Sequence, residues 1–156
     1  MKVDSRAEIV IPKPAEAVFD RAFEPEAFAR RLKPNGPIPG LVSVEWEGGA
    51  TGPAEGARRK VLLTDRSVMR EEITRHARPY EHGYKWLVKP AFPFSLMVAT
   101  AETTFRLDPV EGGTRVVWTY WFTLTSPLAS LPMRGVVHFF RKWQQAALDA
   151  LKTELA

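Results

Sequence analysis

Hydrophobic and polar residues alternate along residues 41–125, and this two-residue period constrains the fold more than any other feature of the sequence. A period of two belongs to a β-strand with one buried face, whereas a helix repeats every 3.6 residues. Turn-forming residues interrupt the alternation at 48–56, 64–67, 75–81, 90–94 and 108–113. The stretch is therefore predicted to be a meander of six antiparallel strands.

The residues before this meander predict one more strand and two short helices. Val3–Ile11 alternates and ends at Pro12. Pro14 opens a helix, where the missing N–H of proline does no harm, and its apolar stripe is Ala15, Val18, Phe19 and Ala22. Pro25 opens a second short helix that carries Phe28 and Leu32 and stops at Pro34.

After residues 126–132 the period changes to 3.6, which predicts an amphipathic helix of about 20 residues. Its apolar stripe comprises Met133, Val136, Val137, Phe140, Gln144, Ala147, Leu148 and Leu151. The sheet has one hydrophobic face that needs a cover, and only this helix is long enough to provide it. The predicted fold class is therefore α+β, with a curved seven-stranded antiparallel sheet wrapped around the C-terminal helix.

Composition narrows the class of protein. At 156 residues the chain is expected to form a single domain, residues 1–156, that buries a core without metals or disulfides. Cysteine is absent, which excludes a disulfide framework and thiolate metal sites. No apolar run reaches the length of a transmembrane helix, and charges interrupt the N-terminus, so it does not read as a signal peptide. We therefore expect a cytoplasmic protein.

Two hairpin registers follow from the expected turns. For the hairpin around residues 64–67, loops of two or four residues give the same pairs, which are Leu62–Met69, Lys60–Glu71 and Arg59–Glu72. For the last hairpin, a turn at 108–113 gives the pairs Phe105–Val116, Thr103–Trp118 and Ala101–Tyr120. One face of the last hairpin is then apolar and the other polar, as in a sheet with one solvated side.

Three segments are similar to a known family: Ile11–Phe19, Arg70–Thr74 and Gly112–Trp118. With the order of elements along the whole chain, they resemble the START/Bet v 1-like (SRPBCC) superfamily, and most of all its polyketide cyclase/dehydrase-like branch. The resemblance implies a helix-grip fold with a hydrophobic cavity between the sheet and the C-terminal helix. It also implies that ligands enter near the loops and the start of that helix.

The strand and helix faces supply candidate cavity residues for a small hydrophobic ligand. Three tryptophans share one parity, and small or polar side chains lie among them. The predicted cavity residues are Trp46, Met69, Glu71, Tyr84, Trp86, Met97, Thr103, Trp118, Tyr120, Met133, Val137, Phe140 and Gln144.

Glu71 and Tyr84 are the candidates for acid/base chemistry. A carboxyl group in a cavity can orient a ligand hydroxyl or transfer a proton, but a structural ion pair of Glu71 with Lys60, with Arg58 also nearby, is favoured over these roles. The sequence also leaves undecided which face of this hairpin points inward, because Val61, Leu63 and Val68 favour the opposite parity. A tyrosine hydroxyl can steer a ligand carbonyl or simply belong to the core.

No metal or cofactor is predicted, because the motifs that bind phosphate, dinucleotide or zinc are missing. His76 and His82 flank an expected turn, where solvated side chains are favoured over a metal pair. His138 falls on the polar side of the C-terminal helix and is expected to be exposed.

The net charge of +4 does not predict nucleic-acid binding, because the basic clusters are scattered over different elements. They lie at Arg30–Lys33, Arg58–Lys60, Arg75 with Arg78, and Arg141–Lys142. Trp121 has the outward parity, and together with the apolar loop 91–94 it suggests a protein contact and a possible homodimer.

Three functions remain open. The first is binding of a hydrophobic or aromatic small molecule, lipid or polyketide-like, in the cavity. The second is a polyketide cyclase/dehydrase-type enzyme in which cavity Glu and Tyr residues position and protonate the substrate. The third is a protein-interaction module. The sequence does not identify the ligand, because one fold supports carriers and catalysts alike.

Overall fold

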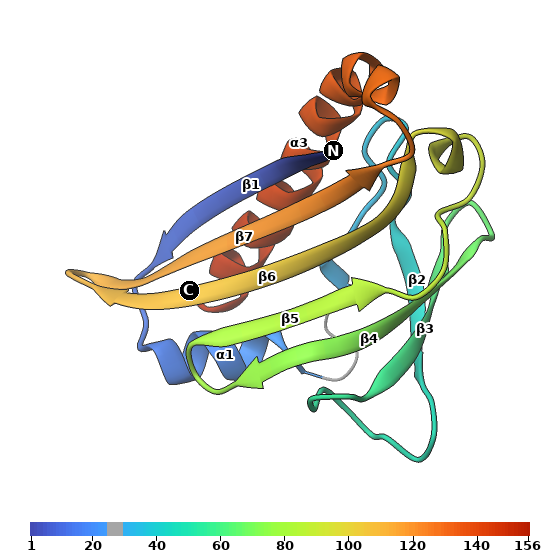
Figure 1. Cartoon of the computed structure of the whole chain (residues 1–156). Helices are drawn as coiled ribbons and strands as arrows, with labels where there is room; N and C mark the ends of the chain where they lie inside the picture. Colours follow the sequence, from blue (N-terminus) through green and yellow to red (C-terminus); the bar gives the residue numbers. More distant parts are fainter. Residues whose placement is uncertain (25–29) are drawn as a thin grey trace.

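The computed structural model describes residues 1–24 and 30–156, and shows a curved sheet that wraps over one long helix (Figure 1). The strands are β1 (Lys2–Ile11), β2 (Leu41–Trp46), β3 (Arg58–Leu63), β4 (Val68–Ala77), β5 (Glu81–Trp86), β6 (Val98–Val110) and β7 (Gly113–Leu124). The helical segments described are α1 (Ala15–Ala22), the 3-10 turns η1 (Phe94–Leu96) and η2 (Pro127–Ala129), and α3 (Ser130–Glu154).

The strands of the described residues form one sheet in the order β1-β7-β6-β5-β4-β3-β2. Each neighbouring pair is antiparallel, so β2 to β7 form the predicted meander and β1 adds to its last strand. Figure 1 shows α3 running along β1, β7 and β6, while β5 to β2 curve away from it. The predicted α+β fold, with a curved antiparallel sheet and a long C-terminal helix, is confirmed.

The first strand and helix follow their predicted faces. Ser5, Ala7 and Ile11 point inward from β1 and are buried. Helix α1 buries the predicted stripe, namely Ala15, Val18, Phe19 and Ala22. The second short helix predicted from Pro25, with Phe28, falls mainly outside the described residues, although Leu32 lies within them and is buried.

Helix α3 has 25 residues and begins at Ser130 instead of near Met133. Pro132 lies in its first turn, where backbone N–H groups have no partner within the helix, so proline is tolerated there. The buried residues of α3 repeat at the helical period, as predicted, and also include Trp143. Gln144 is fully buried: its side chain accepts a hydrogen bond from the Ser5 hydroxyl and donates to two backbone oxygens of β1 and β7.

The predicted register of the β3–β4 hairpin was wrong by one residue. The structure pairs Arg59 with Glu71 and Val61 with Met69, whereas Lys60 lies opposite Arg70. The loop has three residues, because the Leu63 N–H donates to the Ser67 carbonyl at 2.9 Å. An odd loop length turns every side chain of one strand to the other face.

This shift resolves the conflict over the inner face. Val61, Met69 and Glu71 are all buried on the same side of the hairpin, and Val68 is exposed. The predicted pairs Leu62–Met69 and Arg59–Glu72 are replaced by Leu62–Val68 and Arg58–Glu72.

The three-residue loop depends on Arg66, whose φ of 71° lies in the left-handed region. A residue with a Cβ loses roughly 1–2 kcal/mol in a left-handed backbone conformation. Glycine avoids this cost, but its more flexible unfolded state offsets part of the benefit. We expect Arg66→Gly to raise the free energy of unfolding by about 0.5–1 kcal/mol. Urea denaturation checks this, and an unchanged or lower midpoint would contradict the assignment of strain to Arg66.

The predicted register of the β6–β7 hairpin was wrong by two residues. Phe105 lies opposite Trp118, Thr103 opposite Tyr120 and Ala101 opposite Phe122. The strands continue past Pro109 to a two-residue turn at 111–112, so the turn is shorter than expected. A shift of two leaves every side chain on its predicted face. A Cβ at Gly113 would clash with the Ile11 carbonyl, so glycine is required at this tight corner.

Candidate functional site

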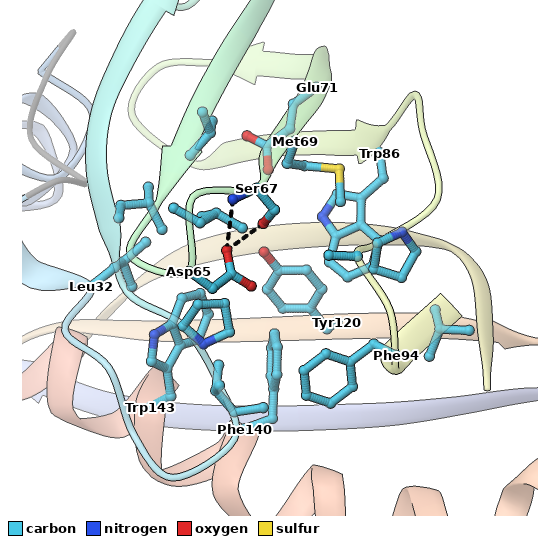
Figure 2. A pocket seen from close by; sticks show the side chains of 18 of the residues that line it. Leu32, Asp65, Ser67, Met69, Glu71, Trp86, Phe94, Tyr120, Phe140 and Trp143 are labelled. Carbon is cyan, nitrogen blue, oxygen red and sulfur yellow. Dashed lines mark hydrogen bonds between the residues drawn. The ribbon is translucent and has the colours of Figure 1, made fainter. Parts of the chain in front are cut away.

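A cavity of about 100 Å³ lies between the inner face of the sheet and α3. Its sheet wall includes Val61, Met69 and Phe122, and its helix wall includes Phe140 and Trp143. Figure 2 shows Phe140 and Trp143 on the side opposite Glu71 and Met69, with the Tyr120 hydroxyl directed into the space between them. The helix and the curved strands diverge here, which leaves the space that side chains do not fill.

Three loops border this cavity. They contribute Ile38 and Pro39 from the loop before β2, Asp65 from the β3–β4 turn, and Ala91 and Phe94 from the segment between β5 and β6. The start of α3 closes the border with Met133 and Val136. Loops can vary in conformation more than strands, so we expect a ligand to enter at this end.

The structure brings seven of the predicted residues to the cavity wall. They are Met69, Glu71, Tyr84, Trp86, Tyr120, Met133 and Phe140. Arg59, Phe94 and Trp143 also line it and were not predicted. Arg59 was missed because the one-residue register error placed it on the outer face, and Trp143 because it lies beside the apolar stripe.

The other predicted residues do not line this cavity. Trp118 stacks on Phe105 with ring centroids 4.6 Å apart, and its indole N–H donates to the Thr103 hydroxyl at 2.7 Å. Trp46 and Met97 are half-buried against the core, and Val137 is buried on α3. Gln144 is occupied by its bonds to Ser5 and to the backbone.

The polar side chains of the cavity gather in one cluster. Arg59 Nε donates to Glu71 Oε1 at 2.8 Å, and both side chains are more than nine-tenths buried. The Arg59 guanidinium also lies 4.7 Å from the centre of the Tyr84 ring and 5.4 Å from that of Trp46. The Tyr84 and Tyr120 hydroxyl oxygens are 2.5 Å apart and share a hydrogen bond. We name Arg59, Glu71, Tyr84 and Tyr120 the polar cluster.

Burial determines the protonation of this cluster. It raises the pKa of Glu71, while the charge and hydrogen bond of Arg59 oppose that rise. It raises the pKa of Tyr84 and of Tyr120 well above the usual value for tyrosine, so both hydroxyls stay neutral. With Tyr84 donating to Tyr120, the Tyr120 O–H can donate to an acceptor in the cavity.

The expectation that His82 is a solvated turn residue was wrong. His82 is fully buried on β5 and stacks on Phe23, with ring centroids 4.1 Å apart. It lies opposite His76 of β4, and their Nδ1 atoms are 3.0 Å apart. The strands extend to Ala77 and from Glu81, so the turn is shorter than expected and the histidines belong to paired strands. His138 is exposed, as predicted.

Burial lowers the pKa of His82 well below its usual value of 6.5, and the charges of Arg59 and His76 add to this effect. The neutral ring is therefore the form that fits the core. Within residues 1–24 and 30–156, no group of three or more His, Asp or Glu side chains gathers as a metal would require.

Arginines of the basic clusters are engaged in ion pairs. Arg31 binds Glu154 at the end of α3, and Arg58 binds Glu72 on the outer face of the sheet. Trp121 points outward from β7 as predicted and is 38% exposed. A homodimer contact at Trp121 stays a prediction. None of the helices described here combines the length and the apolarity that a membrane span requires.

Comparison with known proteins agrees with this architecture. Comparison with the curated proteins gives no match. The solved structure of Ara h 8.0201 has 16% identity and a TM-score of 0.68, with 98% of this chain and 99% of that chain covered. Protein MLL2253 from Mesorhizobium loti has 17% identity and a TM-score of 0.70, with 98% and 96% covered.

A third similar structure is the di-domain ARO/CYC BexL from the BE-7585A biosynthetic pathway, at 17% identity and a TM-score of 0.67. The alignment covers 97% of this chain and 49% of that chain. Such identities establish the fold alone. The family model described as "Polyketide cyclase / dehydrase and lipid transport" matches residues 2–156. The chain therefore belongs to the polyketide cyclase/dehydrase and lipid transport family of the SRPBCC superfamily.

Proposed function

We propose that this protein binds an uncharged hydrophobic small molecule, with an aromatic or alkyl body and one hydrogen-bonding group. The observation that carries the proposal is that the polar side chains of the cavity gather in one cluster while the rest of its wall is mostly apolar. Its walls are largely aromatic and aliphatic, and the polar cluster of Arg59, Glu71, Tyr84 and Tyr120 supplies the buried hydrogen-bonding groups. Ligand sites typically combine apolar walls with a few convergent polar groups.

The energetics support an occupied cavity. If neither water nor a ligand filled it, a space of about 100 Å³ would destabilise the fold by roughly 2 kcal/mol, at about 24 cal/mol per Å³. That is a substantial part of a domain's total stability of about 5–15 kcal/mol. A ligand that fills the cavity recovers part of this free energy as binding affinity.

The charges of the polar cluster favour a neutral ligand. Arg59 and Glu71 neutralise each other, so an ionised ligand would bring an unpaired charge into a buried site. The tyrosine pair offers an O–H donor and acceptor oxygens. A carbonyl or hydroxyl group on an otherwise apolar molecule matches these partners.

Filling the cavity with a larger side chain is expected to weaken ligand binding. Met69 is buried and its side chain reaches into the cavity (Figure 2), so Met69→Trp occupies the ligand's space at a folding cost of about 1–3 kcal/mol. The neutral fluorophore N-phenyl-1-naphthylamine serves as the probe. We expect saturable fluorescence enhancement with the natural chain and an affinity at least about tenfold lower with Met69→Trp.

Val42→Trp is the matched control, because Val42 is 52% exposed on β2 and lies outside the cavity wall. It adds the same ring without filling the cavity, so its probe affinity should equal that of the natural chain. Native mass spectrometry of gently purified protein tests for a co-purified ligand in parallel. Equal probe binding by Met69→Trp and Val42→Trp would refute the cavity as the binding site.

A polyketide cyclase/dehydrase-type activity is the second candidate. It is favoured by the position of Glu71, a carboxyl group with a raised pKa that lines the same cavity as Tyr84. A raised carboxyl pKa approaches the range in which general acids and bases work. Incubating a co-purified ligand with the protein distinguishes the two functions. A carrier returns the ligand unchanged, whereas an enzyme releases a product whose formation Glu71→Gln and Tyr84→Phe should slow.

A further inference from the structure

We propose that the cavity mouth docks on an anionic lipid surface through four exposed apolar side chains, Phe92, Leu96, Leu128 and Leu131. We name these four residues the mouth patch. They are 76%, 65%, 88% and 71% exposed. Among the described residues, Met1 is the one other large hydrophobic side chain more than 52% exposed. Apolar groups so open to water usually mark an interaction site.

The mouth patch comes from two segments that are joined by hydrogen bonds. The Thr125 N–H donates to the Met97 carbonyl at 2.9 Å, and the Thr125 hydroxyl donates to the Leu96 carbonyl at 2.6 Å. The segment around η1 therefore lies beside the connection from β7 to η2 and α3. Figure 1 shows η1 and the start of α3 at the same end of the molecule.

Each of these two segments contributes some side chains to the cavity and others to the outer surface. Ala91 and Phe94 line the cavity, while Phe92 and Leu96 are exposed. On the other side of the mouth, Met133 and Val136 line it and Leu128 and Leu131 are exposed. The mouth patch is thus the outer rim of the entrance, and a surface bound there would meet the cavity directly.

The charge around the mouth patch matches an anionic surface. The two stretches that carry it, residues 82–101 and 112–148, contain no aspartate or glutamate. Lys89 and Arg134 are exposed within them, close in sequence to Phe92 and Leu131. Asp65 is the acidic side chain at the cavity border, and its carboxylate accepts hydrogen bonds from Ser67. Exposed Leu and Phe with nearby Lys and Arg are typical of segments that lie in a lipid interface.

The same charges disfavour a second copy of the chain as the partner. A two-fold contact through the mouth patch would bring Lys89 and Arg134 of two copies near one another, and like charges across an interface oppose association. Anionic headgroups would instead attract both side chains while the apolar groups enter the acyl boundary. An anionic lipid surface therefore matches both the exposed apolar side chains of the mouth patch and the positive charge around it.

Co-sedimentation of the full chain with vesicles tests the proposal. The vesicles are phosphatidylcholine with about one third phosphatidylglycerol. The double variant, which carries both Leu128→Ser and Leu131→Ser, is compared with the natural chain. We expect the double variant to partition at least about tenfold less into the vesicles. The matched control, Val10→Ser with Val42→Ser, removes exposed apolar groups from β1 and β2 and should bind like the natural chain.

Several outcomes would overturn the proposal. These are no binding to the anionic vesicles, equal binding to vesicles of phosphatidylcholine alone, or equal loss in the control variant. Light scattering that shows a dimer dissociated by Leu128→Ser with Leu131→Ser would assign the patch to a second copy instead. Neither leucine lines the cavity, so the double variant should still bind N-phenyl-1-naphthylamine, and a failure of docking is distinguishable from a failure of ligand binding.

Discussion

Replacing Arg59 by methionine is expected to lower the free energy of unfolding by about 3–5 kcal/mol, because it leaves Glu71 as an unpaired buried carboxyl group. The two side chains are 3% and 8% exposed and 2.8 Å apart. For a chain of this length each kcal/mol corresponds to roughly 2–4 °C in Tm. Urea denaturation and thermal unfolding both measure the change.

Arg58 provides a matched control on the same strand. It pairs with Glu72 at 3.0 Å on the outer face, where its side chain is 52% exposed. Surface ion pairs contribute about 0–1 kcal/mol, so Arg58→Met should have little effect. Equal losses in the free energy of unfolding for Arg59→Met and Arg58→Met would show that the buried ion pair stabilises the fold no more than the exposed one.

The double variant Arg59→Met with Glu71→Leu separates the charge from the packing. Replacing a buried ion pair by apolar residues of similar volume is often neutral, or stabilising by about 1–4 kcal/mol. We therefore expect the double variant to recover most of the stability lost in Arg59→Met. It should also bind more weakly any ligand that uses the polar cluster. Recovery of stability with loss of binding would show that the pair serves the cavity more than the fold.

Acidification is expected to destabilise the protein through His82. The native state keeps this ring neutral, because burial lowers its pKa well below 6.5, whereas the unfolded chain takes up a proton near 6.5. The unfolded state then binds more protons, so stability is complete above pH 6.5 and falls as the pH drops toward the native pKa. The slope approaches about 1.4 kcal/mol per pH unit where the unfolded ring is protonated and the native ring is still neutral.

The variant His82→Phe isolates this effect. Phenylalanine retains the contact with Phe23 and cannot be protonated, so the free energy of unfolding should depend less on pH between 6.5 and 5. Glu71 acts in the opposite sense, because its raised pKa makes its stabilising contribution disappear as the pH rises through that value. Carboxyls with lowered pKa, such as Asp20 beside Arg78, lose their contribution only as the pH approaches and passes below about 4. If the free energy of unfolding of the natural chain and of His82→Phe changed equally between pH 6.5 and 5, that result would contradict the role of His82.

The local periodicity of the sequence predicted the elements and most of their faces. The stripe of α1 and the polar side of α3 around His138 are where the 3.6-residue period places them. Alternation in β6 and β7 placed Phe105, Trp118 and Tyr120 on the buried face even though their register was wrong by two. Periodicity succeeds here because side-chain direction depends only on the local backbone.

The candidate site was predicted in part for the same reason. Met69, Tyr84, Trp86 and Tyr120 have the inward parity and line the cavity. Trp118 and Gln144 also point inward but lie where the sheet and α3 are in close contact, so other side chains occupy the space around them. Parity identifies the inner face but not the part of that face where the two layers separate.

By itself, the sequence determined the order of strands and helices, the apolar face of each, and the family to which the chain belongs. The tertiary structure decided which charges are buried together and where the cavity lies. Arg59 meets Glu71 because Arg66 adopts a left-handed conformation that makes the turn three residues long. His82 is buried because Phe23 packs over its strand. Such pairings depend on turn length and on contacts between distant segments, and neither leaves a periodic trace in the sequence.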